Sequence, residues 1–531
     1  MFRPFTLLDW FVVIYYLLAL IILALMMLRS DENEPWQYTA RIQWGWLNIG
    51  ASLFTISFLL EVLLIFAIAA GLTGKGSGIL AWTFIATLFL YAWSIWPNWR
   101  GSDESCIFFP EALPRILRRI ITLMIVFSFI IFKIYVILAI GNFLFASGAH
   151  TFAILILLAS GLMVVVGGYH ALVRMQIIQN IVVAFGLLAL IAWVWFSENG
   201  LEMVGSVIRN QSFLFPAATG PLRGALSWSD ILGLPVIIMS FLGAEYASEH
   251  RFLLVQKQEE VRGGLLFSTA LRIVMAALLL FPVLLNFSAY SLLVPFWPDI
   301  QAPADIPSGL SGLALITVIA ALVSSLSHSL SSGGLLLTQE IYRPLRRNAA
   351  ASELTLVGRL STTGLVLCGL ILIPFFQLHL FTMDVFIRIF LACLCPPLLA
   401  FFTMIHFRQD RISRHTWLAI LPLYALSVYK TVLDYAPGIR VETMPFAAWM
   451  QRMHFLEFAA FLFAVSLASF YLLDVIISRR MEIKAGLFAR PRTTRFTSDL
   501  IASASRWHVG ITVILLLAIT SLWLIYFFPL K

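Results

Sequence analysis

The sequence has little charge. Only 12% of its 531 residues are Asp, Glu, Lys or Arg, whereas 61% are hydrophobic. A soluble protein of this length needs more charged side chains to cover its surface, so the composition excludes an ordinary soluble globular protein. Apolar runs of roughly 20 residues recur along the chain, and each is long enough to cross a bilayer as a helix. The sequence therefore predicts an all-α polytopic membrane protein.

The sequence also lacks the usual signals of cysteine chemistry and of phosphate binding. The four cysteines, Cys106, Cys368, Cys393 and Cys395, have neither metal nor disulfide spacing, and three lie in apolar runs. We expect them to act as small buried hydrophobic side chains. The sequence contains no Walker loop, and we find no nucleophile arrangement or metal cluster in it. These observations argue against an enzyme and against transport driven by ATP hydrolysis in this chain.

The apolar runs predict about fourteen membrane spans. They lie near residues 7–28, 46–72, 78–97, 120–146, 151–171, 175–197, 228–247, 263–290, 309–337, 355–376, 380–405, 415–433, 454–477 and 508–528. With the N-terminus outside, the inner segments carry about three times as many Lys and Arg residues as the outer ones. We therefore expect both termini outside, in a plasma membrane or bacterial inner membrane. Basic inner loops account for the net charge of +8, so no nucleic-acid partner is expected.

Two predicted spans are poorly built as helices. The second span contains GASLFTISFLLE, and the seventh contains Gly233, Pro235 and Gly243. Proline removes a backbone donor and clashes with the preceding turn. Such breaks are tolerated at membrane depth only where they face protein or a cavity. Because the breaks recur five spans apart, they favour an inverted-repeat transporter with a mid-membrane site.

The ninth span continues into ALVSSLSHSLSSGG, which is unusually rich in serine. On a helical wheel Ala321, Ser324, Ser325, His328 and Ser332 share one face. Their oxygens suit a sodium ion if a broken helix opposite adds free carbonyls. Ordinary packing of small residues with local hydroxyl hydrogen bonds also explains the pattern. The residues alone favour packing and leave ion binding as the alternative.

Five segments together resemble the sodium/solute symporter family. The signature-like segment is GLSGLALITVIAALVSSLSHSLSSGGLLLTQEIYRPLRR, with a Ser-Ser pair three residues after Ala321 and a final T-x-E-IYR. The others are GGYHALVRMQIIQNIVVAFG, EHRFLLVQKQEEVRGGLLFSTALRIV, CPPLLAFFTMIHFRQDR and MHFLEFAAFLFAVSL. The last of these is similar to the closing helix of the sodium/glucose branch. The resemblance covers most of residues 45–476.

The resemblance implies a five-plus-five inverted repeat and a sodium site. Residues 1–44 would hold the first transmembrane helix and a loop, 45–200 the first repeat (spans 2–6), 227–406 the second repeat (spans 7–11), and 407–531 helices 12–14. Sodium would bind between the broken second span and the ninth span. The implied ligands are Thr55, Phe58, Ala321, Ser324 and Ser325, of which Thr55, Phe58 and Ala321 contribute only backbone carbonyls.

The sequence also departs from the family pattern near the implied solute pocket. Met175-Gln176 replaces the usual Thr-Asp, Ala81-Trp82 replaces the acid-tryptophan pair of sugar transporters, and Glu245 replaces an asparagine. Sugar specificity is therefore open, and a carboxylate at Glu245 suits an amine or a hydroxyl-rich solute. The candidates for substrate contact or gating are Glu61, Trp82, Glu245 and Tyr246.

The sequence thus predicts a secondary active transporter that couples a small organic solute, sugar-like or otherwise polar, to sodium. Two alternatives remain at this point: a proton-coupled symporter of the same fold, and a transporter-like sensor without net transport. Membrane lipid is the other expected partner. Within the spans, Lys133 is expected either to pair with an acid or to reach cytoplasmic water, and His328 either to sense pH or to form a structural hydrogen bond.

Overall fold

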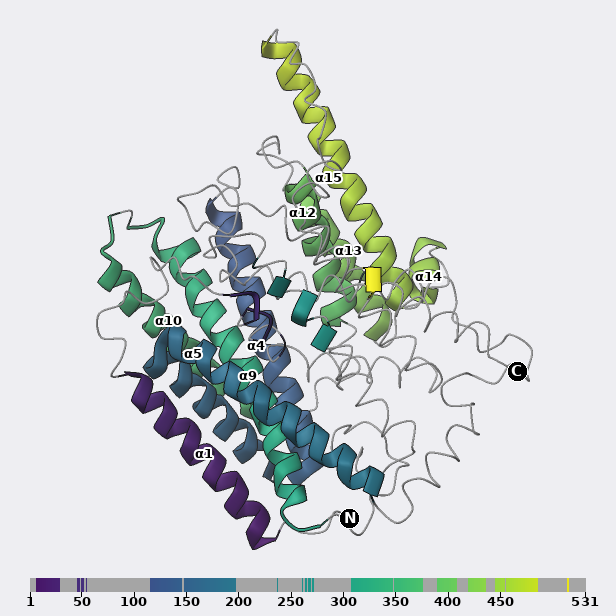
Figure 1. Cartoon of the computed structure of the whole chain (residues 1–531). Coiled ribbons are helices and arrows are strands. Elements are labelled where there is room, and N and C mark those ends of the chain that lie inside the picture. The colour runs from purple at the N-terminus through teal and green to yellow at the C-terminus, as the bar shows by residue number, and fades with distance from the viewer. Residues whose placement is uncertain are drawn as a thin grey trace, which may run out of the picture.

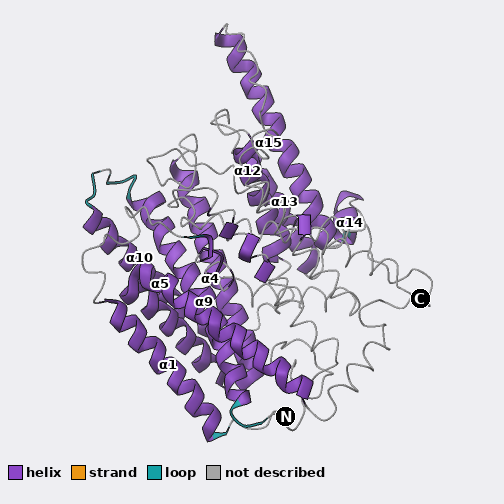
Figure 2. Cartoon of the chain, in the orientation of Figure 1, coloured by secondary structure: helices purple, strands orange, loops and turns teal. Residues whose placement is uncertain are grey.

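A computed structural model describes a defined part of the chain: residues 6–28, 45–47, 49–51, 54, 115–145, 148–196, 236, 260, 263–264, 266–268, 270–271, 307–346, 348–375, 389–407, 419–435, 445–453, 455–485 and 513–514. Within these ranges the regular structure is helical, and Figure 2 draws no strand there. The third predicted span, and most of the second, seventh, eighth and fourteenth, lie outside the described residues.

The described helices follow the predicted spans closely. They are α1 (Leu7–Leu28), α4 (Arg115–Phe145), α5 (Ala149–Phe196), α9 (Leu310–Leu336), α10 (Ala351–Phe375), α12 (Cys395–Phe407), α13 (Ile420–Tyr435), α14 (Pro445–Arg452) and α15 (Phe455–Ala485), with π-helical turns η6 (Leu337–Tyr342) and η8 (Ile389–Leu394) (Figure 1). Among the described residues, four helical segments are long and apolar enough to cross a membrane: Arg118–Asn142, Ala149–Gly167, Leu310–Tyr342 and Ser352–Phe375. The bent pair Pro445–Arg452 and Glu457–Leu473 gives up to five. The total of fourteen stays a prediction.

The helix α5 differs from the sequence prediction, which placed two spans at 151–171 and 175–197. It is one helical run of 48 residues. A straight helix of that length would be roughly 70 Å long, more than twice the hydrocarbon core of a bilayer. In Figure 1 the run bends near its middle, and its apolar halves are Ala149–Gly167 and Arg174–Ala189. No proline lies between the halves, so the backbone turns without losing an amide donor.

The helix α9 lies at the centre of one helix group and packs against α1, α4, α5 and α10. It is buried nearly all round because Ala, Ser and Gly recur on every face and let neighbouring backbones come close. The tightest approach joins α5 and α9 at Gly186. A Cβ atom placed there would lie 1.8 Å from the Thr317 hydroxyl oxygen, so only glycine fits.

The start of α9 is fixed by a side chain from α1. The Asp9 carboxylate accepts hydrogen bonds from the Gly309 amide at 2.7 Å, the Ser311 hydroxyl at 2.7 Å and the Gly312 amide at 2.8 Å. Its other oxygen accepts the Thr6 amide and hydroxyl, each at 2.8 Å. Gly309 has a φ of +93°, which suits glycine, and has no side chain to cap the helix. Asp9 therefore serves as the N-cap of a helix 300 residues away.

A second helix group contains η8, α12, α13 and α15. The helix α12 begins at Cys395-Pro396-Pro397, and Pro397 has no amide to donate to the Cys393 carbonyl. The Ser427 hydroxyl of α13 donates to that carbonyl at 3.0 Å, and the Tyr424 hydroxyl donates to the Leu394 carbonyl at 3.1 Å. Side chains of α13 therefore satisfy the backbone where η8 meets α12.

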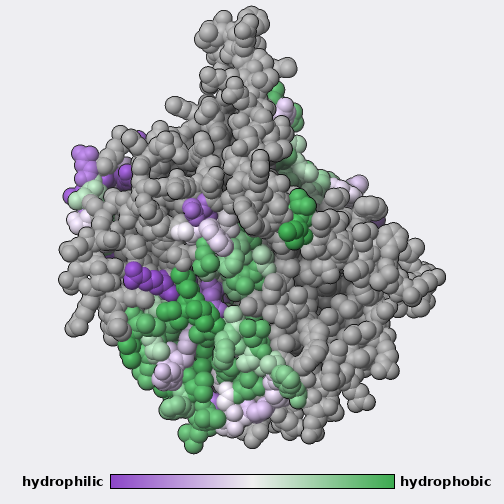
Figure 3. All heavy atoms as spheres, viewed as in Figure 1, coloured by the Kyte–Doolittle hydropathy of each residue, from purple (hydrophilic) through white to green (hydrophobic). Residues whose placement is uncertain are grey.

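The surface of the described helices is strongly apolar. Large apolar side chains stand exposed along α1, α5 and α10, for example Ile14, Phe185 and Ile371. Figure 3 shows apolar side chains over the face formed by α1, α5 and α9, and polar ones near the turn that follows η6. Exposed apolar surface of this extent is typical of contact with lipid.

Candidate functional site

The serine pair of α9 lies in the interior of its helix group. Ala321, Ser324 and Ser325 are all buried, with exposed fractions of 3%, 0% and 3%. Residues spaced i, i+3 and i+4 share one face of a helix, so their oxygens lie together. Within the part of the chain that the structure describes, the hydroxyl oxygens of Ser324 and Ser325 have no hydrogen-bond partner. Such groups are costly to bury, so they require an explanation.

Three other buried or partly buried helical hydroxyls are bonded within their own helices, whereas those of Thr122 and Ser268, like the serine pair, have no partner among the described residues. The Thr317 hydroxyl donates to the Leu313 carbonyl at 2.8 Å, the Thr338 hydroxyl to Gly334 at 2.7 Å, and the Ser466 hydroxyl to Leu462 at 2.6 Å. This bond to the carbonyl four residues earlier is the usual local solution for a buried Ser or Thr. Ser324 and Ser325 do not make it. Their oxygens therefore remain available to a ligand.

A buried lysine borders this face of α9. Lys133 of α4 is 0% exposed, and its ammonium donates to the backbone carbonyl of Ser325 at 3.0 Å. Of the two sequence expectations, the one in which Lys133 reaches water is wrong. Because Lys133 contacts the carbonyl of Ser325 and not its hydroxyl, the hydroxyl remains open. The lysine ties α4 to the residue that carries a candidate ligand.

Other polar groups of the stretch make contacts between helices or within α9. The Ser160 hydroxyl of α5 donates to the Val323 carbonyl at 3.3 Å, and the Ser327 hydroxyl of α9 donates back to the Ser160 carbonyl at 3.4 Å. His328 is fully buried, and its Nε2 lies 3.5 Å from the Ser332 hydroxyl. These contacts fit a packing role for this part of the serine-rich stretch.

The second span meets α5 close to the predicted break. The side-chain amide of Asn180 donates to the carbonyl of Ala51, and the Trp46 amide donates to the Glu260 carboxylate at 2.7 Å. Ala51 precedes Thr55 by four residues. Thr55 and Phe58, the two predicted carbonyl ligands of this span, lie outside the described residues. The substrate or gating candidates Glu61, Trp82, Glu245 and Tyr246 also lie outside them.

The opposite end of α9 carries an ion pair that the sequence did not reveal. Arg118 of α4 and Glu340 of η6 lie 3.6 Å apart, with side chains 9% and 0% exposed. The sequence indicated a topological role for Arg118, but the residue also links two helices. Glu340 is the acid of T-x-E-IYR, so the motif itself was the available signal. Here the helix passes into a π-helical turn, where the Arg343 amide bonds the Thr338 carbonyl five residues back.

The residues that the structure describes fit half of a sodium site. Sodium is a hard cation that binds neutral oxygens, and α9 offers two open hydroxyls beside the Ala321 carbonyl. Among the described residues no group of three His, Cys, Asp or Glu side chains gathers to hold a metal. A transition-metal site needs nitrogen or sulfur ligands, so the chemistry of this face suits an alkali cation better.

Comparisons with known proteins agree with this chemistry. The chain matches the Sodium:solute symporter family over residues 37–411. It is 22% identical over 449 residues to "Sodium/myo-inositol cotransporter 2" of Homo sapiens, covering 73% of this chain and 64% of that protein. It is 24% identical over 362 residues to "Sodium/glucose cotransporter 1" of Sus scrofa, covering 59% of this chain and 54% of that protein.

A solved structure shows the same fold. It is the substrate-bound outward-open state of a Na+-coupled sialic acid symporter, 16% identical, with a TM-score of 0.67 over 89% of this chain and 98% of that one. The alignment with the human myo-inositol cotransporter, by contrast, spans less than two thirds of that protein. The described helices therefore form part of a helical membrane transporter fold, and the chain belongs to the sodium:solute symporter family.

Proposed function

We propose that the protein is a secondary active transporter that carries a small organic solute together with sodium. The observation that carries this proposal is the pair of buried hydroxyls of Ser324 and Ser325, which have no hydrogen-bond partner among the described residues. Sodium binds these oxygens and the Ala321 carbonyl on α9, and the carbonyls of Thr55 and Phe58 on the second span. Family membership also supports transport across a membrane, and not catalysis of a chemical step, as the activity.

The proposed architecture extends the described helices to fourteen spans. Spans 2–6, within residues 45–200, and spans 7–11, within residues 227–406, form two inverted repeats. Residues 1–44 and 407–531 add the flanking helices, and both termini lie outside the plasma membrane. The contacts of α9 support this arrangement, because its start meets Asp9 of α1 while its other end meets Arg118 of α4. The basic residues Arg343 and Arg346 gather at the second of these ends, as expected for the inner side.

The proposed solute is a hydroxyl-rich small molecule. The relatives are named for myo-inositol and glucose, and the solved symporter for sialic acid. Glu61, Trp82, Glu245 and Tyr246 contact the solute or gate its pocket, with Glu245 accepting hydrogen bonds from hydroxyl or amine groups. Sugars and inositol share this donor pattern, so they form the first set of solutes to test.

Sodium and solute are coupled in this scheme because both bind preferentially to the same conformation. Sodium joins α9 to the second span, and the solute binds the conformation that this junction favours. If both ligands favour the same state, each strengthens the binding of the other. One sodium ion moving through 100 mV supplies about 2.3 kcal/mol, and its concentration gradient adds to this drive.

Uptake by the full chain in liposomes tests the proposal. Labelled myo-inositol, glucose and sialic acid are offered with an inward gradient of NaCl, of KCl, or of protons at equal salt. We expect sodium-dependent accumulation of at least one solute, reduced at least tenfold by Ser325→Ala and unchanged by Ser466→Ala. Ser466 is an equally buried helical serine whose hydroxyl is already bonded. Accumulation driven by protons and indifferent to sodium would overturn the choice of ion.

A further inference from the structure

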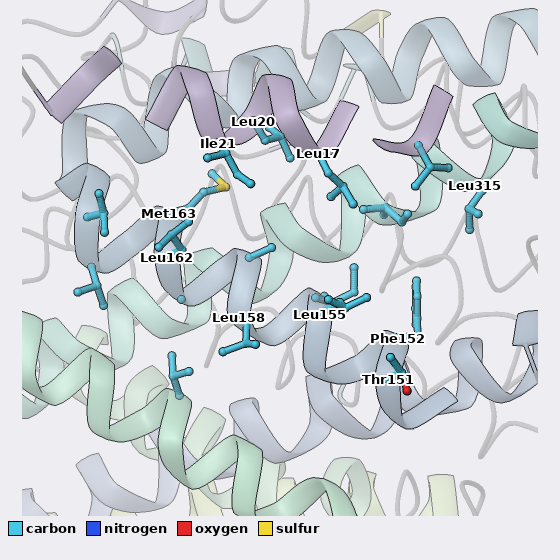
Figure 4. A pocket seen from close by; sticks show the side chains of 18 of the residues that line it. Leu17, Leu20, Ile21, Thr151, Phe152, Leu155, Leu158, Leu162, Met163 and Leu315 are labelled. Atoms are coloured by element: carbon cyan, nitrogen blue, oxygen red, sulfur yellow. The ribbon is translucent and has the colours of Figure 1, made fainter. Parts of the chain in front are cut away.

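A large apolar cavity lies away from the serine pair, between α1 and the first half of α5. Its volume is about 860 Å³. Figure 4 shows Leu17, Leu20 and Ile21 of α1 on one side of it and Leu155 and Leu158 of α5 on the other. The helices α9 and α10 complete its wall. The volume falls within the range of sites that bind small molecules.

The lining of this cavity excludes a polar ligand. Among the described residues that line it, no side chain is charged, and only Thr151 and Thr363 bear a hydroxyl group. Sugars and inositol bring several hydroxyl groups, each of which needs a partner when buried. The cavity is therefore unsuited to the transported solute, and it is suited to a hydrocarbon.

Small residues create the hollow, and aromatic rings close one end of it. Gly148, just before α5, and Ala159 and Gly161 of α5 line the cavity without filling it. At the end where Asp9 ties α1 to α9, the Trp10 ring stacks on Phe145 with centroids 6.2 Å apart. Phe145 in turn lies 5.3 Å from Phe152.

The cavity is walled by helices that are apolar enough to lie in a membrane. Its wall comes from the spans Ala149–Gly167, Leu310–Tyr342 and Ser352–Phe375 and from the apolar helix Leu7–Leu23. Rim side chains such as Leu155 and Leu158 are 56% and 46% exposed, so the cavity is open to the hydrocarbon around the protein. Its α5 wall runs from Thr151 to Val166, roughly 22 Å of helix. One leaflet of the hydrocarbon core is only about 15 Å thick, so an acyl chain fits lengthwise.

We propose that this cavity binds one acyl chain of a membrane phospholipid, and that the bound chain stabilises the packing of α1 against α5. The chain fills space that protein atoms leave open and supplies the contacts that α1 lacks there. Leu315 and Ile319 of α9 also line the cavity, so the bound lipid touches the helix that carries the serine pair. The site requires only that the protein spans a membrane, and it is independent of the coupling ion.

Photolabelling of the full chain in liposomes tests this site. The probe is a phosphatidylcholine with a diazirine in the middle of one acyl chain, and labelled residues are mapped by mass spectrometry. We expect labelling of residues 10–21 and 151–166 to exceed that of the exposed α10 side chains, such as Leu360 and Leu367, at least fivefold. Comparable labelling of both surfaces would mean ordinary lipid contact and would overturn the proposal.

A matched pair of variants distinguishes lipid bound in the cavity from lipid in contact with the rest of α5. Ala159→Phe fills the cavity and should lower labelling there at least fivefold. Ala184→Phe makes the same change at another partly buried alanine of α5 that does not line the cavity, and should leave labelling unchanged. Undiminished labelling in a folded Ala159→Phe protein would contradict the site. If Ala159→Phe fails to fold, the fivefold enrichment in the unaltered protein still decides the question.

Discussion

The two polar sites on α9 differ in how completely their hydrogen bonds are satisfied. At the start of the helix, the Asp9 carboxylate accepts five hydrogen bonds, so both of its oxygens are in use. Twelve residues beyond Gly312, the hydroxyls of Ser324 and Ser325 are equally buried and have no partner in the described part of the chain. Both sites lie on one helix and face neighbouring spans.

This difference distinguishes a polar site that stabilises the fold from one that can bind a ligand. A polar group whose bonds are all made within the protein stabilises the fold, and a ligand would have to break those bonds to use it. A buried polar group left open costs free energy, and a ligand that bonds to it recovers that cost. The Asp9 site therefore anchors α9, and the serine pair is the place where a cation is expected. The predictions below test whether the satisfied sites act only on stability.

Removing the Glu340 charge should give the largest loss of stability. Glu340→Gln leaves the Arg118 guanidinium, which is 9% exposed, without its acidic partner. Breaking a buried ion pair from one side costs about 3–5 kcal/mol. Thermal melting of the purified protein should show a large fall in midpoint, of equal size in NaCl and KCl.

The control for this change is the exposed pair at the same end of the bundle. Arg346 and Glu353 lie 2.7 Å apart with side chains 66% and 23% exposed. Exposed pairs contribute about 1 kcal/mol or less, so Glu353→Gln should lower the midpoint far less than Glu340→Gln. Equal effects of the two variants would show that burial does not set the strength of these pairs.

Removing the Asp9 carboxylate should come next. Asp9→Ala leaves the amides of Gly309 and Gly312 without their acceptor, and we expect a loss of about 2–3 kcal/mol. Asp9→Asn keeps one acceptor oxygen and should lose less. Melting in the two salts again measures the effect. A loss seen in NaCl alone would mean that the Asp9 site takes part in ion binding, and the comparison between the two sites would fail.

A smaller loss is expected at the start of α12. Ser427→Ala leaves the Cys393 carbonyl, which Pro397 already deprives of an amide, with no donor from α13. One such hydrogen bond contributes about 1 kcal/mol. Ser466→Ala removes only a bond to its own helix and should change the midpoint little. A Ser427 variant as stable as the Ser466 variant would indicate that the Cys393 carbonyl does not need the bond.

The sequence predicted local features well and long-range contacts poorly. Runs of apolar residues located the helices, because span length and hydrophobicity are properties of neighbouring residues. The serine face of α9 could be drawn from helical periodicity alone. The Asp9 cap could not be foreseen, because an aspartate in the first turn of a helix ordinarily caps its own helix. Its partner Gly309 lies 300 residues away.

The α5 helix and the serine pair show two further limits of prediction from sequence. The spans 151–171 and 175–197 are apolar enough to be separate, and Gly167-Gly168 lies near the end of the first, but no proline follows, so the helix continues through the bend. For the serines, the residues alone favoured packing over ion binding, because residue type does not reveal whether a hydroxyl is already bonded. Only the structure distinguishes Ser327, which bonds Ser160, from Ser324 and Ser325.

The most direct test of the account is thermal melting in matched NaCl and KCl for the unaltered protein, Ser325→Ala and Ser466→Ala. A ligand that binds only the folded state raises its stability, by about 2.7 kcal/mol at a hundred times its dissociation constant. We expect NaCl to raise the midpoint of the unaltered protein and of Ser466→Ala, and to raise that of Ser325→Ala much less. Identical midpoints in the two salts for the unaltered protein, or an undiminished sodium effect in Ser325→Ala, would contradict a sodium site at the serine pair.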